Sequence, residues 1–285
     1  MLRLPTIATL LLALFGAAGH AGAGTRFGAL AVDAIRDSIE ARDCKTAVER
    51  LKSGLGNEYP EVFLLAGSMY EQGICVKRDW SRAVSFYVQA HDAGEDSAAP
   101  RIAAGYAEPV NGPDVAAALW WAWKARGFQL HHCGVPKEAG ADPDRFVAEL
   151  KTWPKERLSV CNYLAGVMST MSGELKYPEL AAEHALGGDV TLRFLPGVPR
   201  IELQRGESRE YQMLGWVSGD ALRDRKSRKM ADGFEAALST VANRALARYP
   251  HPGGISADAL IEVKYTFTME HEKRRCTVSK PCTAD

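Results

Sequence analysis

The sequence predicts a chain of two parts, in which stacked pairs of α-helices are followed by a small α+β domain. Three observations support this. Apolar residues recur at helical spacing from Thr25 to about Ser172, and an aspartate and an alanine recur there with a period of about 35 residues. Alternating apolar and polar residues then follow Gly173. With a leading apolar segment, we expect three regions: 1–23, 24–172 and 173–285.

The first region has the pattern of a secretion signal. Met1-Leu2-Arg3 supplies a short positive start, Leu4 to Ala18 is almost wholly apolar, and small residues follow. Signal peptidase accepts small side chains one and three residues before the cut, so we expect cleavage after Ala21 or Ala23. The alternative is a retained membrane anchor, but the apolar run is shorter than the roughly 20 residues that cross a bilayer. We therefore expect a periplasmic mature protein.

The charge balance argues against one class of partner. Lysine plus arginine equals aspartate plus glutamate, at 35 residues each. Nucleic-acid-binding proteins normally carry an excess of basic residues, so no nucleic-acid partner is expected.

Six cysteines follow the leading segment. An even number of cysteines in an exported chain favours disulfides, but six of them allow 15 pairings. Pairing between sequence neighbours would close each loop within one local region. On that basis we predict the disulfides Cys44–Cys75, Cys133–Cys161 and Cys276–Cys282.

The second region has the pattern of paired helices. One buried helix face is predicted from the spacing of Leu30, Ile35, Ile39, Val48 and Leu51. Glycines that would end helices are Gly54, Gly73, Gly94 and Gly127.

A repeated pair of residues gives this region its period. Asp43, Asp79 and Asp114 each stand four residues before an alanine, namely Ala47, Ala83 and Ala118. An aspartate can cap a helix by accepting hydrogen bonds from its first free amides, and an alanine one turn later lets another helix approach closely. The recurrence predicts stacked helix pairs.

One stretch carries a family resemblance. Leu65 to Gly94 contains Ala66-Gly67-Ser68-Met69-Tyr70, Gly73, Val76, Asp79, Ala83, Phe86-Tyr87, Ala90 and Gly94. It resembles the Sel-one-like repeat, a relative of the tetratricopeptide repeat, with Cys75 in place of the second glycine of the turn. A degenerate copy contains Asp114, Ala118, Trp120-Trp121, Lys124-Ala125 and Gly127. The resemblance implies an α-solenoid that presents a concave surface to peptides or partner proteins.

A tryptophan cluster lies in the degenerate copy. Trp120, Trp121 and Trp123 would form part of a partner-binding surface, or most of them would pack between helices. Large aromatic side chains more often lie in the core, and we favour that interpretation for most of the cluster.

The third region is predicted to have the order strand, strand, helix, strand. Val190 to Phe194 and Ile201 to Leu203 alternate as half-buried strands do. Phe234 to Tyr249 is amphipathic, with one face made of Phe234, Leu238, Val241, Ala245 and Leu246. Ala259 to Phe267 forms the last strand, with Ile261, Val263, Tyr265 and Phe267 on one side.

This order and several short segments resemble the TonB C-terminal domain. The matching segments are Tyr177-Pro178-Glu179, Ala181-Ala182, Gly188 to Phe194, Glu235 to Leu238, Tyr249 to Pro252 and Ile261 to Phe267. The chain departs from the family in a polar insertion from Glu207 to Gly233, and in having no proline-rich spacer. The resemblance implies a sheet edge that binds a strand of a partner, with Val263, Tyr265 and Phe267 in that edge strand.

The remaining polar clusters do not indicate an enzyme or a metal site. His131-His132-Cys133 with Cys161 would suit zinc, but a disulfide with neighbouring histidines is the simpler interpretation in an oxidising compartment. Ser-x-x-Lys, a nucleophile elbow and a phosphate-binding loop are absent. The basic run Arg223, Arg225, Lys226, Arg228 and Lys229 would contact anionic lipid or an acidic partner, or form a solvated loop. No cofactor is expected.

We therefore predict a non-catalytic periplasmic adaptor that binds a peptide or an envelope protein such as an outer-membrane component. The first alternative is a TonB-type energy transducer for outer-membrane transport, which requires a retained anchor. The second is an envelope hydrolase built on the helical repeats.

Overall fold

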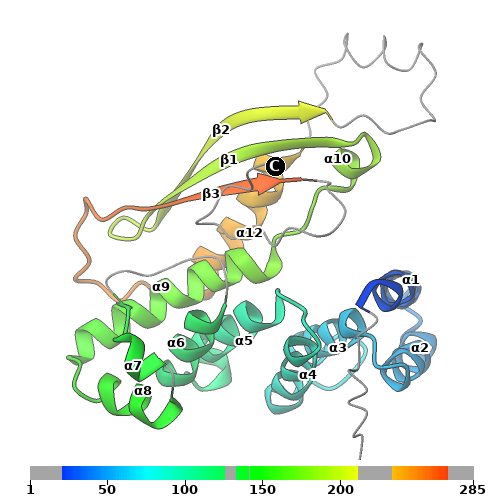
Figure 1. Ribbon diagram of the computed structural model, residues 1–285, viewed down its shortest axis with the longest axis horizontal. Helices are drawn as coiled ribbons and strands as arrows, with labels where there is room; N and C mark the ends of the chain where they lie inside the picture. The colour runs from blue at the N-terminus through cyan, green and yellow to red at the C-terminus, as the bar shows by residue number, and fades with distance from the viewer. Residues whose placement is uncertain (1–20, 126–132, 141, 211–232, 269–285) are drawn as a thin grey trace, which may run out of the picture.

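The computed structural model describes residues 21–125, 133–140, 142–210 and 233–268 (Figure 1). Within these ranges the chain is mostly helical, with one small antiparallel sheet toward the C-terminal end. The predicted signal segment up to residue 20 lies outside them, and cleavage after Ala21 or Ala23 stays a prediction. None of the described helices is long and apolar enough to span a bilayer.

The helical part is a series of helices, short except for the 20-residue α1 and α9, and most of them pack against the next one along the chain. Its elements are α1 (Ala21–Glu40), α2 (Cys44–Gly56), α3 (Pro60–Gln72), α4 (Trp80–Asp92), α5 (Ala98–Ala107), a 3-10 turn η1 (Pro109–Asn111), α6 (Val115–Lys124), α7 (Lys137–Gly140), α8 (Pro143–Leu150) and α9 (Lys155–Glu174).

The predicted aspartate caps are confirmed. The side chains of Asp43, Asp79 and Asp114 accept hydrogen bonds from the amides of the third residue of α2, α4 and α6, at 3.0, 3.0 and 2.9 Å. The alanines four residues later, which are Ala47, Ala83 and Ala118, are completely buried. The recurrence therefore marks where three helices begin and where each meets a neighbour.

Replacing the cap Asp79 by alanine should lower the free energy of unfolding by about 1 kcal/mol, because an amide at the start of α4 loses its acceptor. Asp92 is the matched control. It lies at the other end of α4, where a negative charge opposes the helix dipole, so Asp92→Ala should be neutral or slightly stabilising. Urea unfolding of both variants measures the difference, and equal losses would contradict the capping role.

Two sequence expectations about this part are wrong. Leu30 is 58% exposed, whereas Val32 and Ile35 hold the buried face of α1. Gly54 lies inside α2 and does not end it. The lack of a side chain at Gly54 lets α3 pack closely against α2, since a Cβ there would lie only 2.9 Å from the Val62 side chain. Gly73 does end α3, with a φ of 72° that a glycine adopts without strain.

Helix α9 lies at the centre of the molecule, between the short helices and the sheet (Figure 1). Its residues from Tyr163 to Met171 are buried, so it has no solvent-facing stripe along this stretch. One apolar cluster runs from α5, α6 and α8 through α9 into the sheet and α12 (Phe234–Arg248). The core is thus continuous across the boundary that the sequence suggested at residue 172.

The predicted order of strand, strand, helix, strand is confirmed. A short helix α10 (Glu179–Glu183) precedes β1 (Leu186–Leu195) and β2 (Arg200–Glu210), and β3 (Ile261–Phe267) follows α12. The strands are antiparallel in the order β2-β1-β3. Val190, Leu192 and Phe194 of β1 face the core, as the alternation predicted. On α12, Phe234, Leu238, Val241 and Ala245 are buried together, while Leu246 is half-buried.

Two of the three predicted disulfides are confirmed. Cys44 is bonded to Cys75, and Cys133 is bonded to Cys161. The third predicted pair, Cys276–Cys282, lies outside the described residues. Two structural disulfides fit an exported protein, since reducing compartments disfavour them.

Candidate functional site

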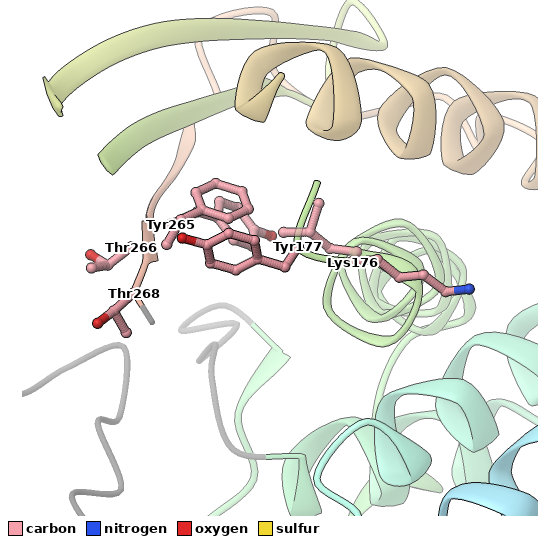
Figure 2. Close-up of a pocket in the computed structure, with 7 residues that line it drawn as sticks. Lys176, Tyr177, Tyr265, Thr266 and Thr268 are labelled. Atoms are coloured by element: carbon pink, nitrogen blue, oxygen red, sulfur yellow. The ribbon is translucent and has the colours of Figure 1, made fainter. Parts of the chain in front are cut away.

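A pocket of about 220 Å³ lies at the end of strand β3 (Figure 2). One wall is the connection from α9 to α10, and the other is the C-terminal half of β3 with the residue after it. The lining residues are Leu175, Lys176, Tyr177, Tyr265, Thr266, Phe267 and Thr268. Thr266 and Thr268 lie on one side of the aromatic rings, and the Lys176 side chain extends away on the other (Figure 2).

Strand β3 is an edge strand of the described sheet. Each of its residues from Ile261 to Phe267 is paired with one of β1, from Phe194 to Gly188. Among the described residues no other strand pairs with β3. An edge of this kind presents a row of main-chain N–H and C=O groups to which another extended segment can bond.

The other edge, at β2, has features that oppose strand addition. It carries a series of exposed or half-exposed charged residues and a register shift against Gly188 and Val190 of β1. Charged side chains and bulges are the devices by which proteins protect sheet edges. Strand β3 also carries exposed charges, at Glu262 and Lys264, but it pairs with β1 without a register shift, so of the two edges it is the better candidate for binding.

Aromatic packing makes the wall behind the pocket rigid. The rings of Phe234 and Phe267 are stacked with centroids 4.2 Å apart, and the Tyr177 ring meets both edge-on at 5.7 and 5.8 Å. The Tyr177 hydroxyl donates a hydrogen bond to the main-chain oxygen of Leu186. Because α12, β3 and the α9–α10 connection are joined here, the pocket is largely preformed.

The predicted edge residues lie in β3, but their side chains face inward. Val263 and Phe267 are only 8% and 6% exposed and belong to the main apolar cluster. Burial also raises the pKa of the Tyr265 phenol well above its usual range. These side chains therefore hold the strand in place. A partner at this edge would meet the backbone of β3, the threonines, the exposed Glu262 and Lys264, and the parts of Tyr265 and Phe267 that line the pocket.

The predicted tryptophan cluster lies on α6, far along the chain from this pocket. Trp120 and Trp121 are partly buried and pack against the main core. Trp123 is 49% exposed, stacks on Trp120 with ring centroids 5.9 Å apart and covers Gly140. The Lys124 ammonium lies 4.9 Å above the Trp120 ring. The structure thus places two tryptophans in packing roles and leaves one at the surface.

Other sequence candidates fall elsewhere. The basic residues Arg223, Arg225 and Lys226 and the histidines His131 and His132 lie outside the described residues. Cys133 and Cys161 form a disulfide, so neither offers a thiolate to a metal. In the described ranges no group of three or more histidine, cysteine, aspartate or glutamate side chains is placed to hold a metal ion.

Sequence reasoning missed a buried charge network centred on Arg248 at the end of α12. Its guanidinium contacts Glu71 of α3 and Glu108 after α5, both at 2.5 Å, and Glu174 of α9 at 3.2 Å. Arg248 and Glu174 are each 11% exposed and Glu71 is 7% exposed. Burial alone would lower the pKa of Arg248, but its anionic surroundings outweigh this and raise it.

Two tyrosines extend this network into the core. The Tyr87 hydroxyl donates to Glu71 at 2.6 Å, and burial followed by the Glu71 charge raises the pKa of Tyr87. The Tyr249 hydroxyl donates to the main-chain oxygen of Ala104 at 2.9 Å and lies 2.9 Å from the Thr170 hydroxyl. The network therefore fastens α12, and with it the sheet, to α3, α5 and α9.

Comparison of the chain with protein-family models, curated proteins and solved structures found no match.

Proposed function

We propose that this chain is a non-catalytic binding protein of the bacterial cell envelope, which receives an extended segment of a partner along the outer edge of β3. The observation that carries the proposal is the pocket between the C-terminal half of β3 and residues 175–177. It adjoins a strand edge that has no neighbour among the described residues. Backbone bonds along such an edge supply affinity, and adjoining pockets select side chains.

Other features support the envelope setting and the two resemblances. The disulfides and the apolar leading segment suit export to the periplasm. The capped helices with buried alanines support kinship with Sel-one-like repeats, in which the helical part would be a solenoid. The three-stranded sheet with one helix supports kinship with the TonB C-terminal domain. The Arg248 network would hold the binding edge in a fixed position on the helical part.

Peptide display on the immobilised full chain tests the proposal. Random linear peptides should enrich extended sequences in which apolar and polar residues alternate, because the pocket accepts alternate side chains of an added strand. Thr266 is exposed and lines the pocket, so Thr266→Trp should fill part of it and weaken the selected peptides at least about tenfold, or about 1.4 kcal/mol.

The matched control is Gln204→Trp, which places the same tryptophan side chain at an exposed position on β2, at the other edge of the sheet. It should leave binding unchanged. Enrichment of no peptide, or equal weakening by the two substitutions, would contradict binding at β3.

A further inference from the structure

Three exposed polar side chains alternate along β3 with the buried and half-buried ones. They are Glu262, Lys264 and Thr266. The side chains of Glu262 and Lys264 are 58% and 61% exposed. Because successive side chains of a strand point to opposite faces of the sheet, a segment added to β3 would place every second residue beside these three.

Opposite charges already face one another across the strands of this sheet. Arg193 of β1 stands in register with Glu202 of β2 and with Glu262 of β3. Its guanidinium lies 3.3 Å from the Glu202 carboxylate and 3.5 Å from the Glu262 carboxylate. This row runs acid, base, acid and ends on Glu262, beyond which the described residues contain no further strand. A basic residue on an added strand would continue the row.

Lys264 presents the opposite charge to the same edge. Its ammonium lies 2.7 Å from the carboxylate of Asp189 on β1, which Arg209 of β2 also contacts at 2.6 Å. The Asp189 side chain is only 2% exposed, so a partner would meet the Lys264 ammonium and not this carboxylate. An ammonium has three N–H donors and can bind a second carboxylate while it keeps the first. The partner residue beside Lys264 is therefore expected to be acidic.

Residues directly opposite each other on neighbouring strands have Cβ atoms about 4.5–5.5 Å apart, and opposite charges stabilise such a pair. We propose that the β3 edge selects a strand with a basic residue opposite Glu262 and an acidic residue opposite Lys264. The residue between them would be apolar, because it lies beside Val263 on the core side of the sheet. This inference rests on the proposed strand binding at β3 and specifies the charge of the strand that binds. In a parallel strand the basic residue comes first, and in an antiparallel strand the acidic residue comes first.

A focused peptide library on the immobilised full chain tests the charge selection. Its short peptides carry valine at every second position and a random choice of lysine, glutamate or threonine at the others. Selection should enrich lysine and glutamate two positions apart, and their order gives the direction of the added strand. Replacing the enriched lysine by glutamate should weaken binding about fivefold, because an attractive pair with Glu262 becomes a repulsive one.

The Glu262→Lys chain provides the rescue. It should bind the glutamate peptide more tightly than the lysine peptide, which is the reverse of the order that the unaltered chain shows. Glu49→Lys is the matched control, since it makes the same charge change at an exposed position of α2 and should leave the original order in place. The Lys264→Gln chain should lose the preference for glutamate at the other position, while Arg209 still pairs with Asp189.

The outcomes separate this inference from the function on which it rests. Peptides that Thr266→Trp weakens but that carry no paired charges would overturn the charge selection and leave strand binding at β3 standing. So would an unchanged order of the two peptides on the Glu262→Lys chain, or the same reversal on the Glu49→Lys chain. Enrichment of no peptide would overturn both the charge selection and strand binding.

Discussion

Replacing Arg248 by leucine is expected to lower the free energy of unfolding by about 3–5 kcal/mol, because the buried carboxylates of Glu71, Glu108 and Glu174 lose the cation that they share. Such a loss is a large part of the roughly 5–15 kcal/mol that stabilises an ordinary domain. Thermal or urea unfolding followed by circular dichroism measures it.

Arg200→Leu is the control for this substitution. Arg200 contacts Glu202 at 2.7 Å, but its side chain is 62% exposed, and a surface ion pair contributes only about 0–1 kcal/mol. If the two variants lose similar amounts, the Arg248 network does not fasten α12 to the helical part.

Removal of the Cys133–Cys161 disulfide, as the Cys133→Ala/Cys161→Ala variant, should have the second large effect. Cross-linking a loop of this length stabilises a protein by roughly 3–4 kcal/mol through the entropy of the unfolded chain. Both sulfurs also lie in the main apolar cluster, with Cys133 and Cys161 8% and 1% exposed, so their loss weakens packing against α9. Chemical unfolding measures the loss.

The Cys44–Cys75 disulfide provides a matched comparison. Its sequence separation is 31 residues against 28, so the entropic contributions are nearly equal. Cys44 is exposed and Cys75 only half-buried. The Cys44→Ala/Cys75→Ala variant should therefore lose less stability than the other one, and the reverse order would contradict the central role of α9.

Features set by residues close in the chain could be predicted from the sequence. The caps at Asp43, Asp79 and Asp114 depend on amides three residues away. The alternation in Val190–Phe194 and the apolar face of α12 depend on simple periods. The two confirmed disulfides join cysteines that are neighbours in sequence order.

Features made by distant residues escaped prediction. Arg248 is separated in sequence from Glu71 by 177 residues and from Glu108 by 140 residues. No local sequence pattern predicts that these side chains contact one another. The far end of β2 has no apolar alternation and becomes a strand because it pairs with β1. The stretch from Tyr163 to Met171 of α9 is buried because α5 and α6 pack on one side of it and α12 with the sheet on the other.

The candidate site was partly predictable. The sequence predicted a strand from Ala259 to Phe267, and the resemblance to the TonB C-terminal domain implied that it lies at a sheet edge. The structure has this edge strand, which begins two residues later, at Ile261. The pocket wall at 175–177 was not predicted, because it belongs to a connection without periodicity.

Hydrogen exchange along β3 tests the central claim most directly. With a display-selected peptide bound to the full chain, the outward amides of residues 261–267 should become protected, because they would bond to the added strand. The amides of β2, at the opposite edge, should exchange as before and provide the internal control. Protection confined to β2 or to α6 around Trp123, with β3 unchanged, would contradict strand binding at β3.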